Sequence, residues 1–301
     1  MDRVKRLIHC ERAYKAGLSG KRVTVAVMDT GAAPHPDFSN RIVAFRDFCG
    51  KRISMYDDNG HGTHVAGIIG GNGSRSKDDR GRYRYAGIAP KVEYVILKVL
   101  DQKGNGVTSH VLEGVDWLLH NREKYGIRIL NISVGMLPSA GKIEREALLY
   151  AVDAVWDSGI AVISAAGNNG PGENTVTIPG ISRKVITVGS LDDEVVPTER
   201  AGKLMKGYTG FGPTECCIVK PEILAPGTNI TSCAKDGTYT VKSGTSMAAP
   251  VVSGALALAL ERHPDWLPAD LKLRLYESAY PRGEQIGRNC WGILHTDNLI
   301  Q

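Results

Sequence analysis

Five short, almost uninterrupted runs of Val, Ile and Leu constrain the fold of this 301-residue chain more than any other feature. Strands buried on both faces of a parallel sheet have this composition, whereas strands with one solvated face alternate apolar and polar residues. The runs predict strands at residues 23–28, 92–100, 127–133, 160–165 and 185–189. Longer segments between them place apolar residues at helical spacing, as in residues 109–120 and 144–157. The order strand, helix, strand predicts a three-layer α/β fold with helices on both faces of a mostly parallel central sheet.

A later segment, residues 246–261, is rich in Ala and Leu and apolar almost all round, which predicts a central, buried helix. Shorter helices are predicted at residues 64–70 and around residues 271–275. Pro and Gly are spread through the chain, and no repeat or low-complexity linker interrupts it. We therefore expect a single domain over residues 1–301.

The charge and hydropathy of the chain argue against nucleic-acid and membrane partners. The net charge is +5, but no cluster of Lys and Arg is interleaved with aromatic residues. No segment reaches the roughly 18 consecutive apolar residues of a transmembrane helix. We expect neither partner.

Three polar residues lie directly beside apolar segments, where the active sites of α/β sheets collect. Asp29 ends the first strand, and a carboxylate there is costly to bury without a partner. A turn-capping role is one alternative. Another is the Asp-Thr-Gly signature of aspartic proteases, but that enzyme needs two such carboxylates and this chain has one Asp-Thr-Gly.

His61 and Ser246 each precede a predicted helix. His61 lies between two glycines, and His64 follows three residues later, but the Glu of the zinc-protease pattern is missing. Ser246 lies directly before the long buried helix, where free backbone N–H groups favour developing negative charge. A serine nucleophile needs an adjacent base. The alternative for Ser246 is an ordinary helix N-cap.

Taken together, the three segments resemble the subtilisin-like serine proteases, the subtilases. The order Asp, His, Ser is that family's order and differs from the orders in chymotrypsin-like enzymes and α/β-hydrolases. Similar segments extend from residue 17 to residue 263 and include residues 20–27, 87–90 and 220–227. The resemblance implies a serine endopeptidase that hydrolyses peptide bonds through an acyl-enzyme intermediate. In it Ser246 is the nucleophile, His61 the base and Asp29 the residue that orients the histidine.

The resemblance also implies an oxyanion hole and two substrate-binding segments. Asn168 matches the asparagine whose side-chain amide stabilises the oxyanion together with the backbone N–H of Ser246. Taken alone, Asn168 would be a turn asparagine before Gly170. The two segments that hold a substrate as an added strand are matched by Gly104, Asn105 and Gly106 on one side and by Ser133, Val134 and Gly135 on the other.

The first specificity pocket departs from the family pattern. Many relatives have a second glycine after Gly135, where this chain has residues 136–138 with the sequence Met-Leu-Pro. The floor of the pocket is expected near Asn169 and Thr177, and neither is acidic. We therefore expect an apolar or broad preference at P1, the substrate residue before the cut bond.

Calcium is the one cofactor that the resemblance raises, since the chemistry itself requires none. Asp37 matches a carboxylate that often binds calcium in the family; a turn aspartate after Pro36 is the alternative. Residues 71–85 replace the usual companion loop and are rich in Arg and Lys, which disfavours a hard cation with oxygen ligands. A structural calcium ion at Asp37 is therefore the less favoured interpretation.

The cysteines and the N-terminus bear on the cellular compartment. The six cysteines form no Cys-x-x-Cys pair, and the neighbours Cys216 and Cys217 suit a disulfide framework poorly, so we expect free thiols. The N-terminal residues are charged, and no apolar signal-peptide core follows. We expect a cytoplasmic protein. The alternative is a secreted protein whose N-terminal signal and pro-segment are absent from this chain.

The expected partners are protein or peptide substrates. Two other functions stay open: a dedicated processing or signalling protease with a narrow target, and a non-catalytic subtilase-like binding module. A binding module would be marked by a missing triad or oxyanion residue, and the chain has them all.

Overall fold

A computed structural model describes residues 1–133, 135, 141–195, 198, 204–212, 214, 218–281 and 290–301. Its centre is an eight-stranded sheet with the order β10-β7-β6-β5-β4-β1-β3-β2, in which every pairing is parallel. The strands are β1 (Thr24–Asp29), β2 (Ile42–Asp47), β3 (Glu93–Lys98), β4 (Ile127–Ile132), β5 (Ala161–Ala165), β6 (Ile186–Ser190), β7 (Ile223–Ala225) and β10 (Gly292–Ile293). The predicted parallel sheet is confirmed.

The five predicted strands are β1, β3, β4, β5 and β6, and these five occupy the middle of the sheet. The strands that the apolar runs did not predict lie towards its edges. β2 is an edge strand with mostly half-buried and exposed residues, and its apolar run is only four residues long before Arg46 interrupts it. A separate antiparallel pair, β8 (Ile230–Cys233) and β9 (Tyr239–Lys242), was also not predicted.

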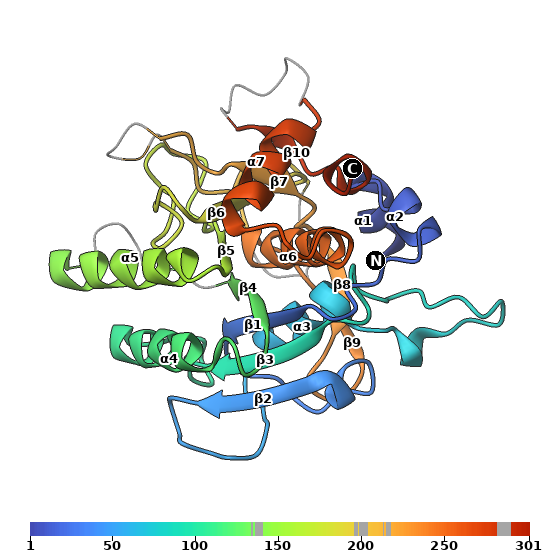
Figure 1. Cartoon of the computed structure of the whole chain (residues 1–301), viewed down its shortest axis with the longest axis horizontal. Coiled ribbons are helices and arrows are strands. Elements are labelled where there is room, and N and C mark those ends of the chain that lie inside the picture. The colour runs from blue at the N-terminus through green and yellow to red at the C-terminus, as the bar shows by residue number, and fades with distance from the viewer. Residues whose placement is uncertain are drawn as a thin grey trace.

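Helices cover both faces of the sheet (Figure 1). On one face α3 (His61–Gly70) packs against α6 (Thr245–Arg262), and on the other α4 (Thr108–Asn121) packs against α5 (Lys142–Asp157). Successive residues of a strand point to opposite faces, so Val25 and Val27 join the core under α3 and α6, while Ala26 and Met28 join the core under α4 and α5. The three-layer arrangement is therefore confirmed.

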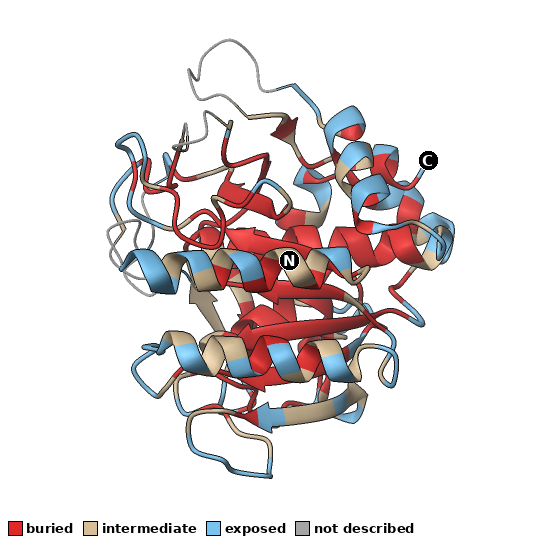
Figure 2. Ribbon diagram, turned by 60° about the vertical axis from the view of Figure 1, so that its left-hand side comes forward, coloured by how far each residue is buried: buried red, intermediate tan, exposed pale blue. Residues whose placement is uncertain are grey.

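The predicted central helix is α6, which is buried from Thr245 to Leu260 except at Ser246. Figure 2 shows the buried residues concentrated in the middle of the molecule, with exposed residues on outer helices and loops. Glycine at 254 lets α6 approach the opposite helix closely, because a Cβ there would meet Ile88 and the Ile69 carbonyl. The buried helix thereby holds its N-terminus at a fixed place against the sheet.

The two ends of the chain pack against each other. α2 (Glu11–Lys15) contacts α8 (Thr296–Leu299), and the Asp297 carboxylate accepts hydrogen bonds from the Arg12 and Ala13 backbone N–H groups at 3.0 Å each. The remaining helices are α1 (Asp2–Leu7), α7 (Pro268–Ser278) and the short 3-10 helices η1 (Ser39–Arg41) and η2 (Ser74–Ser76). One core cluster includes residues from both chain ends, which supports the expectation of one domain; the domain boundary itself stays a prediction.

Every helix in the described part of the chain is too short or too polar to cross a membrane.

The packing of α6 gives a test of the core. Leu256 is fully buried, whereas Leu273 on α7 is 55% exposed. Leu256→Ala is expected to lower the free energy of unfolding by about 2–5 kcal/mol, because it removes buried methyl groups and leaves a cavity. Leu273→Ala, the matched control, is expected to change it by less than about 0.5 kcal/mol. Urea denaturation of the two variants would measure this, and equal midpoints would contradict the assignment of α6 to the core.

Candidate active site

Two of the predicted site residues meet directly at the carboxyl end of β1. Asp29 is the last residue of β1 and its side chain is fully buried; His61 is the first residue of α3. His61 Nδ1 lies 2.8 Å from Asp29 Oδ1 and 3.0 Å from Oδ2. The backbone N–H of Thr30 donates a further 2.7 Å hydrogen bond to Oδ1. The buried carboxylate therefore has the partners that its charge requires.

This contact controls the charge state of His61. Burial by itself would lower the pKa of the imidazole, but the charge of Asp29 and its hydrogen bond outweigh burial and raise the pKa above the ordinary 6.5. The side chain of His61 is 24% exposed, so the ring reaches solvent while its Nδ1 edge faces the buried carboxylate. Such a ring can accept a proton at Nε2 and keep it stabilised by Asp29.

Ser246 is the second residue of α6, at the N-terminus of the buried helix. Its Oγ donates a 2.8 Å hydrogen bond to the backbone carbonyl of Ser133, directly after β4. Within the described part of the chain, no hydrogen bond joins Ser246 Oγ to His61. The structure thus brings Ser246 and Ser133 together, and the Ser246 side chain points at a carbonyl rather than at the imidazole.

Asn168 lies beside the same helix terminus. Its Oδ1 accepts hydrogen bonds from the backbone N–H of Thr245 at 2.9 Å and from Thr245 Oγ1 at 3.0 Å. These two hydrogen bonds hold the Oδ1 side of the amide towards Thr245, so Nδ2 points away from Thr245. Glycine at 244 has a φ of +144° and leaves space here, since a Cβ would lie 3.2 Å from Asn168 Nδ2. A donor is thus held next to Ser246.

Parts of the two predicted substrate-binding segments line one pocket of about 280 Å³. Gly104, Asn105, Gly106 and Gly135 are among its lining residues and Ser133 is not; their role in substrate binding stays a prediction. Val134 lies outside the described residues, as do residues 136–138. Most of the other lining side chains are apolar: Leu100, Val107, Val111, Ile132, Leu148 and Ile178. Thr177 is buried close to Gly135, where a Cβ on that glycine would collide with the threonine side chain.

Sequence reasoning missed several residues that hold the site. Thr245 anchors Asn168, and Thr30 and Asp57 join the end of β1 to the start of α3. Lys98 is a buried cation beside them. The signal for each was weak, because a lone Thr, Asp or Lys next to a motif has many ordinary roles.

His64 does not pair with His61 as a metal ligand. Its Nε2 faces the backbone carbonyls of Ile230 at 3.1 Å and Thr240 at 3.3 Å, on the β8–β9 pair. Burial, together with the neighbouring Lys242, lowers the pKa of His64 to about 3. The ring is therefore neutral and packs α3 against the hairpin.

The residues around Asp37 do not fit a calcium ion. Asp37 Oδ1 accepts from Ser74 Oγ at 3.0 Å, and Oδ2 accepts from Tyr239 OH at 2.8 Å and from Cys233 Sγ at 3.6 Å. Burial raises the pKa of the Cys233 thiol far above its usual range, so Sγ keeps the proton that it donates. The carboxylate oxygens that a calcium ion would need are already bonded.

A guanidinium group also occupies the neighbouring carbonyl oxygens. Arg41 Nη2 donates 2.6 Å hydrogen bonds to the backbone carbonyls of Asp37 and Gly70. Calcium takes 6–8 oxygen ligands and is repelled by a fixed cation, so these bonded oxygens beside Arg41 do not fit the ion. Among the described residues, one group of three or more His, Cys, Asp and Glu side chains is close enough to share a metal ion: His35, Asp37 and Cys233.

Three cysteines of the described chain, Cys10, Cys49 and Cys233, are free thiols, as predicted. Cys216 and Cys217 lie outside the described residues.

Comparisons with known proteins show which family the chain belongs to. The model of the subtilase family matches residues 20–293. The chain is 39% identical over 292 residues to serine protease AprX of Bacillus subtilis, covering 90% of this chain and 65% of AprX, so it spans slightly less than two thirds of that relative. It is 33% identical over 281 residues to subtilisin DY of Bacillus licheniformis, covering 92% and 91% of the two chains.

A solved structure shares the fold. The crystal structure of a cold adapted subtilisin-like serine proteinase superposes with a TM-score of 0.74 and 32% sequence identity, over 93% of this chain and 90% of the other. With the family model matching most of its length, the chain belongs to the subtilase family of subtilisin-like serine endopeptidases.

Proposed function

We propose that this chain hydrolyses peptide bonds with Ser246 as nucleophile, His61 as general base and acid, and Asp29 as the residue that orients His61. The observation that carries the proposal is the 2.8 Å contact between His61 Nδ1 and the buried Asp29 carboxylate. It directs the proton of the neutral imidazole to Nδ1 and leaves Nε2 as the acceptor.

Proton transfer requires a rotation of the Ser246 side chain. The hydroxyl leaves the Ser133 carbonyl, to which it donates at 2.8 Å, and turns towards His61 Nε2. Rotation about χ1 between staggered positions is fast and needs no backbone movement. Catalytic hydrogen bonds often tighten only when substrate is bound, so a resting serine turned elsewhere is compatible with this role.

The reaction also requires hydrogen-bond donors that stabilise the oxyanion. As Ser246 attacks the scissile carbonyl, negative charge develops on the carbonyl oxygen, and Asn168 Nδ2 and the Ser246 backbone N–H are its proposed donors. The Thr245 contacts that fix the Asn168 amide support this assignment. In a subtilisin, loss of one such side-chain donor lowers kcat by roughly 10²–10³. His61 then protonates the leaving amine, and water releases the acyl-enzyme.

The chemistry needs no metal ion or other cofactor, and the Asp37 network supports a site without calcium. Protein or peptide substrates follow from the function. The cytoplasmic location and the width of the natural target range stay predictions.

Ser246→Ala tests the function and separates an enzyme from a binding module. The variant is expected to lose casein hydrolysis by about 10³-fold or more, because the acyl-enzyme cannot form. Ser54→Ala, which removes an exposed hydroxyl, is the matched control and is expected to keep wild-type activity. Hydrolysis that survives the loss of the Ser246 hydroxyl would rule out the mechanism, and an inactive wild-type protein would favour the binding module.

The pH dependence follows from His61. The imidazole must be neutral to accept the serine proton, and its raised pKa keeps it protonated to a higher pH than an ordinary histidine. kcat/KM is therefore expected to be full above that pKa and to fall about tenfold per pH unit below it, with a midpoint above 6.5. Measuring kcat/KM on a peptide substrate as a function of pH gives this acidic limb of the profile. A rate that is flat between about pH 5 and pH 9 would contradict the role of His61.

The pocket predicts substrate preference. The Gly104–Gly106 segment and Gly135 adjoin a mostly apolar pocket, and Thr177 beside Gly135 carries no charge. We propose that the enzyme accepts apolar side chains, or a broad range of side chains, at P1. We also propose that it prefers apolar side chains at the substrate positions before P1.

A panel of tetrapeptides with Phe, Leu, Arg or Glu at P1 tests this preference. Phe and Leu are expected to give kcat/KM values about 10-fold or more above Glu, because an unpaired charge is costly to desolvate in an apolar pocket. A clear maximum for Arg would show that an acidic partner lies in the pocket and would overturn the proposal.

A further inference from the structure

Asp57 lies four residues before His61 and has no place in the chemistry described so far. The residue is 6% exposed, yet its carboxylate is fully bonded. Oδ1 accepts from Thr30 Oγ1 at 2.9 Å, from the Gly60 N–H at 2.7 Å and from the Asn59 N–H at 3.1 Å. Oδ2 accepts from the Thr63 N–H at 2.9 Å and from Thr63 Oγ1 at 2.6 Å. Two oxygens offer about four lone-pair sites, so their capacity is used completely.

These hydrogen bonds keep Asp57 ionised. Burial alone would raise the pKa of the carboxyl, but the hydrogen bonds from Thr63, Gly60 and Thr30 outweigh it and lower the pKa. The site therefore contains a second buried negative charge besides Asp29, placed next to the first turn of α3.

The donors to Asp57 connect the two residues of the Asp29–His61 pair: Thr30 lies next to Asp29, and Thr63 lies in α3, which begins with His61. Thr30 follows Asp29 and donates its N–H to Asp29 Oδ1 at 2.7 Å, while its hydroxyl donates to Asp57. The same Thr30 Oγ1 accepts the N–H of Gly62, the residue after His61, at 2.9 Å. One hydroxyl and one carboxylate thus join the end of β1 to the helix that carries the imidazole.

The contact between these two segments is close enough to need glycine. A Cβ on Gly62 would collide with the Gly31 carbonyl and lie 3.2 Å from Asp29. The backbone of α3 therefore rests directly on the end of β1, and a change in the Asp57 links would change the distance from His61 to Asp29.

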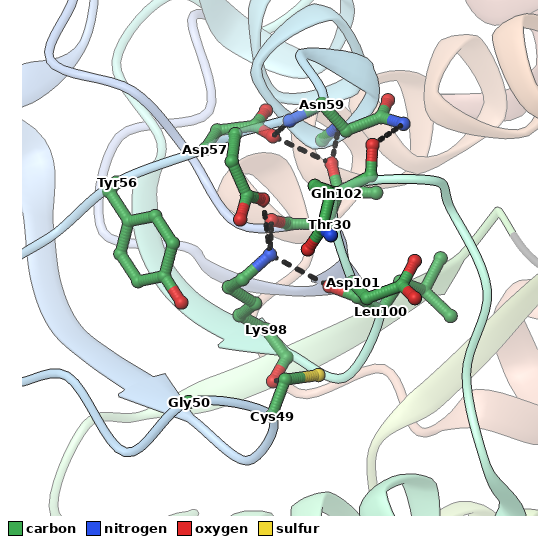
Figure 3. Close-up of polar contacts among 12 residues, drawn as sticks. Thr30, Cys49, Gly50, Tyr56, Asp57, Asn59, Lys98, Leu100, Asp101 and Gln102 are labelled. Atoms are coloured by element: carbon green, nitrogen blue, oxygen red, sulfur yellow. Dashed lines mark hydrogen bonds and ion pairs between the residues drawn. The ribbon is translucent and has the colours of Figure 1, made fainter.

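A buried lysine holds the same loop from the other side (Figure 3). Lys98 Nζ donates to the carbonyls of Thr30 and Leu100 at 2.7 Å each and pairs with Asp58 Oδ1 at 2.8 Å. Asn59 Nδ2 donates to the carbonyl of Gln102 at 3.1 Å, which ties the loop to the segment leading to Gly104. The loop before His61 is thus attached to the Asp29–His61 pair through Asp57 and through Asn59 Oδ1, which accepts the His61 N–H at 3.1 Å. Asn59 Nδ2 attaches it to the substrate segment as well.

We propose that Asp57 is a positioning residue of the protease site: its carboxylate sets α3 against β1 at the separation that lets His61 meet Asp29. The inference rests on the proposed function. It concerns the geometry and charge of the base, not the binding of substrate.

Four other charged or titratable groups act on or face His61, and each bears on the test. Asp29 comes from β1, Lys242 from β9, Asp57 from the loop, and His64 from the next turn of α3. The negative charges of Asp29 and Asp57 favour the imidazolium, and the positive charge of Lys242 opposes it. Moving His61 away from Asp29, or removing the charge of Asp57, therefore lowers the pKa of His61, whereas the loss of a contact that holds neither residue leaves that pKa unchanged.

The test compares Asp57→Asn with Asp58→Asn in the full chain. Every partner of the Asp57 carboxylate donates, so the NH2 group of an asparagine faces a donor whichever way the amide turns, and the links on that side are broken. Asp57→Asn is expected to lower kcat by roughly 10–100-fold with KM within about twofold, since small displacements of a base have this effect. The acidic limb of kcat/KM is expected to move to lower pH. Asp58→Asn still accepts from Lys98 and is expected to keep the wild-type kcat, KM and limb.

Either a wild-type kcat or an unmoved acidic limb in folded Asp57→Asn would overturn the proposal. Thermal melting followed by circular dichroism shows whether the variant is folded. If it is not, Thr30→Val decides, because it removes the hydroxyl that joins Asp57 to Gly62: a lower kcat with the limb moved to lower pH supports the proposal, and a wild-type kcat or an unmoved limb overturns it. An inactive wild-type protein would instead refute the proposed function, so the two failures are distinguishable.

Discussion

The site depends on keeping a carboxylate charged in the interior of the protein. Asp29 is fully buried at the end of β1, and a buried charge without partners is costly. Its partners are the Thr30 N–H and His61 Nδ1, so the strand end and the helix start must be brought within hydrogen-bond distance. Asp57, itself buried and charged, joins those two segments. The need of the buried Asp29 carboxylate for partners thus constrains the loop that carries Asp57 and leads into α3.

The parallel sheet makes this possible with residues far apart in sequence. Because all eight strands pair in parallel, the carboxyl ends of β1, β4 and β5 lie at the same end of the sheet. Asp29, Ser133 and Asn168 are at or just beyond those ends. Ser246 lies at the N-terminus of α6. The buried body of this helix holds that terminus against the same end of the sheet. Catalytic groups on strand ends and a buried helix are more rigid than groups on free loops.

The Asp37 region shows how this chain departs from the family pattern without changing its fold. The resemblance raised a calcium ion there, and the structure has uncharged donors around the carboxylate and Arg41 on two carbonyls. A guanidinium presents several N–H donors in a fixed plane and stays charged at any working pH. It holds Asp37 and Gly70 together as a cation would, but it cannot be removed by a chelator.

The sequence by itself determined the sheet interior and the helices between its strands, because buried parallel strands and helical spacing are local patterns. The segments around Asp29, His61 and Ser246 are local patterns too, and from them the sequence predicted the residues of the site. It did not predict β2, β7, β10 or the β8–β9 pair, which are short or partly exposed, so any apolar run in them is too brief to stand out. Only the tertiary structure decided that Thr245 orients Asn168 and that Asp57 joins β1 to α3. Such roles depend on which backbone N–H groups and hydroxyls meet across the fold, and no spacing along the chain records those meetings.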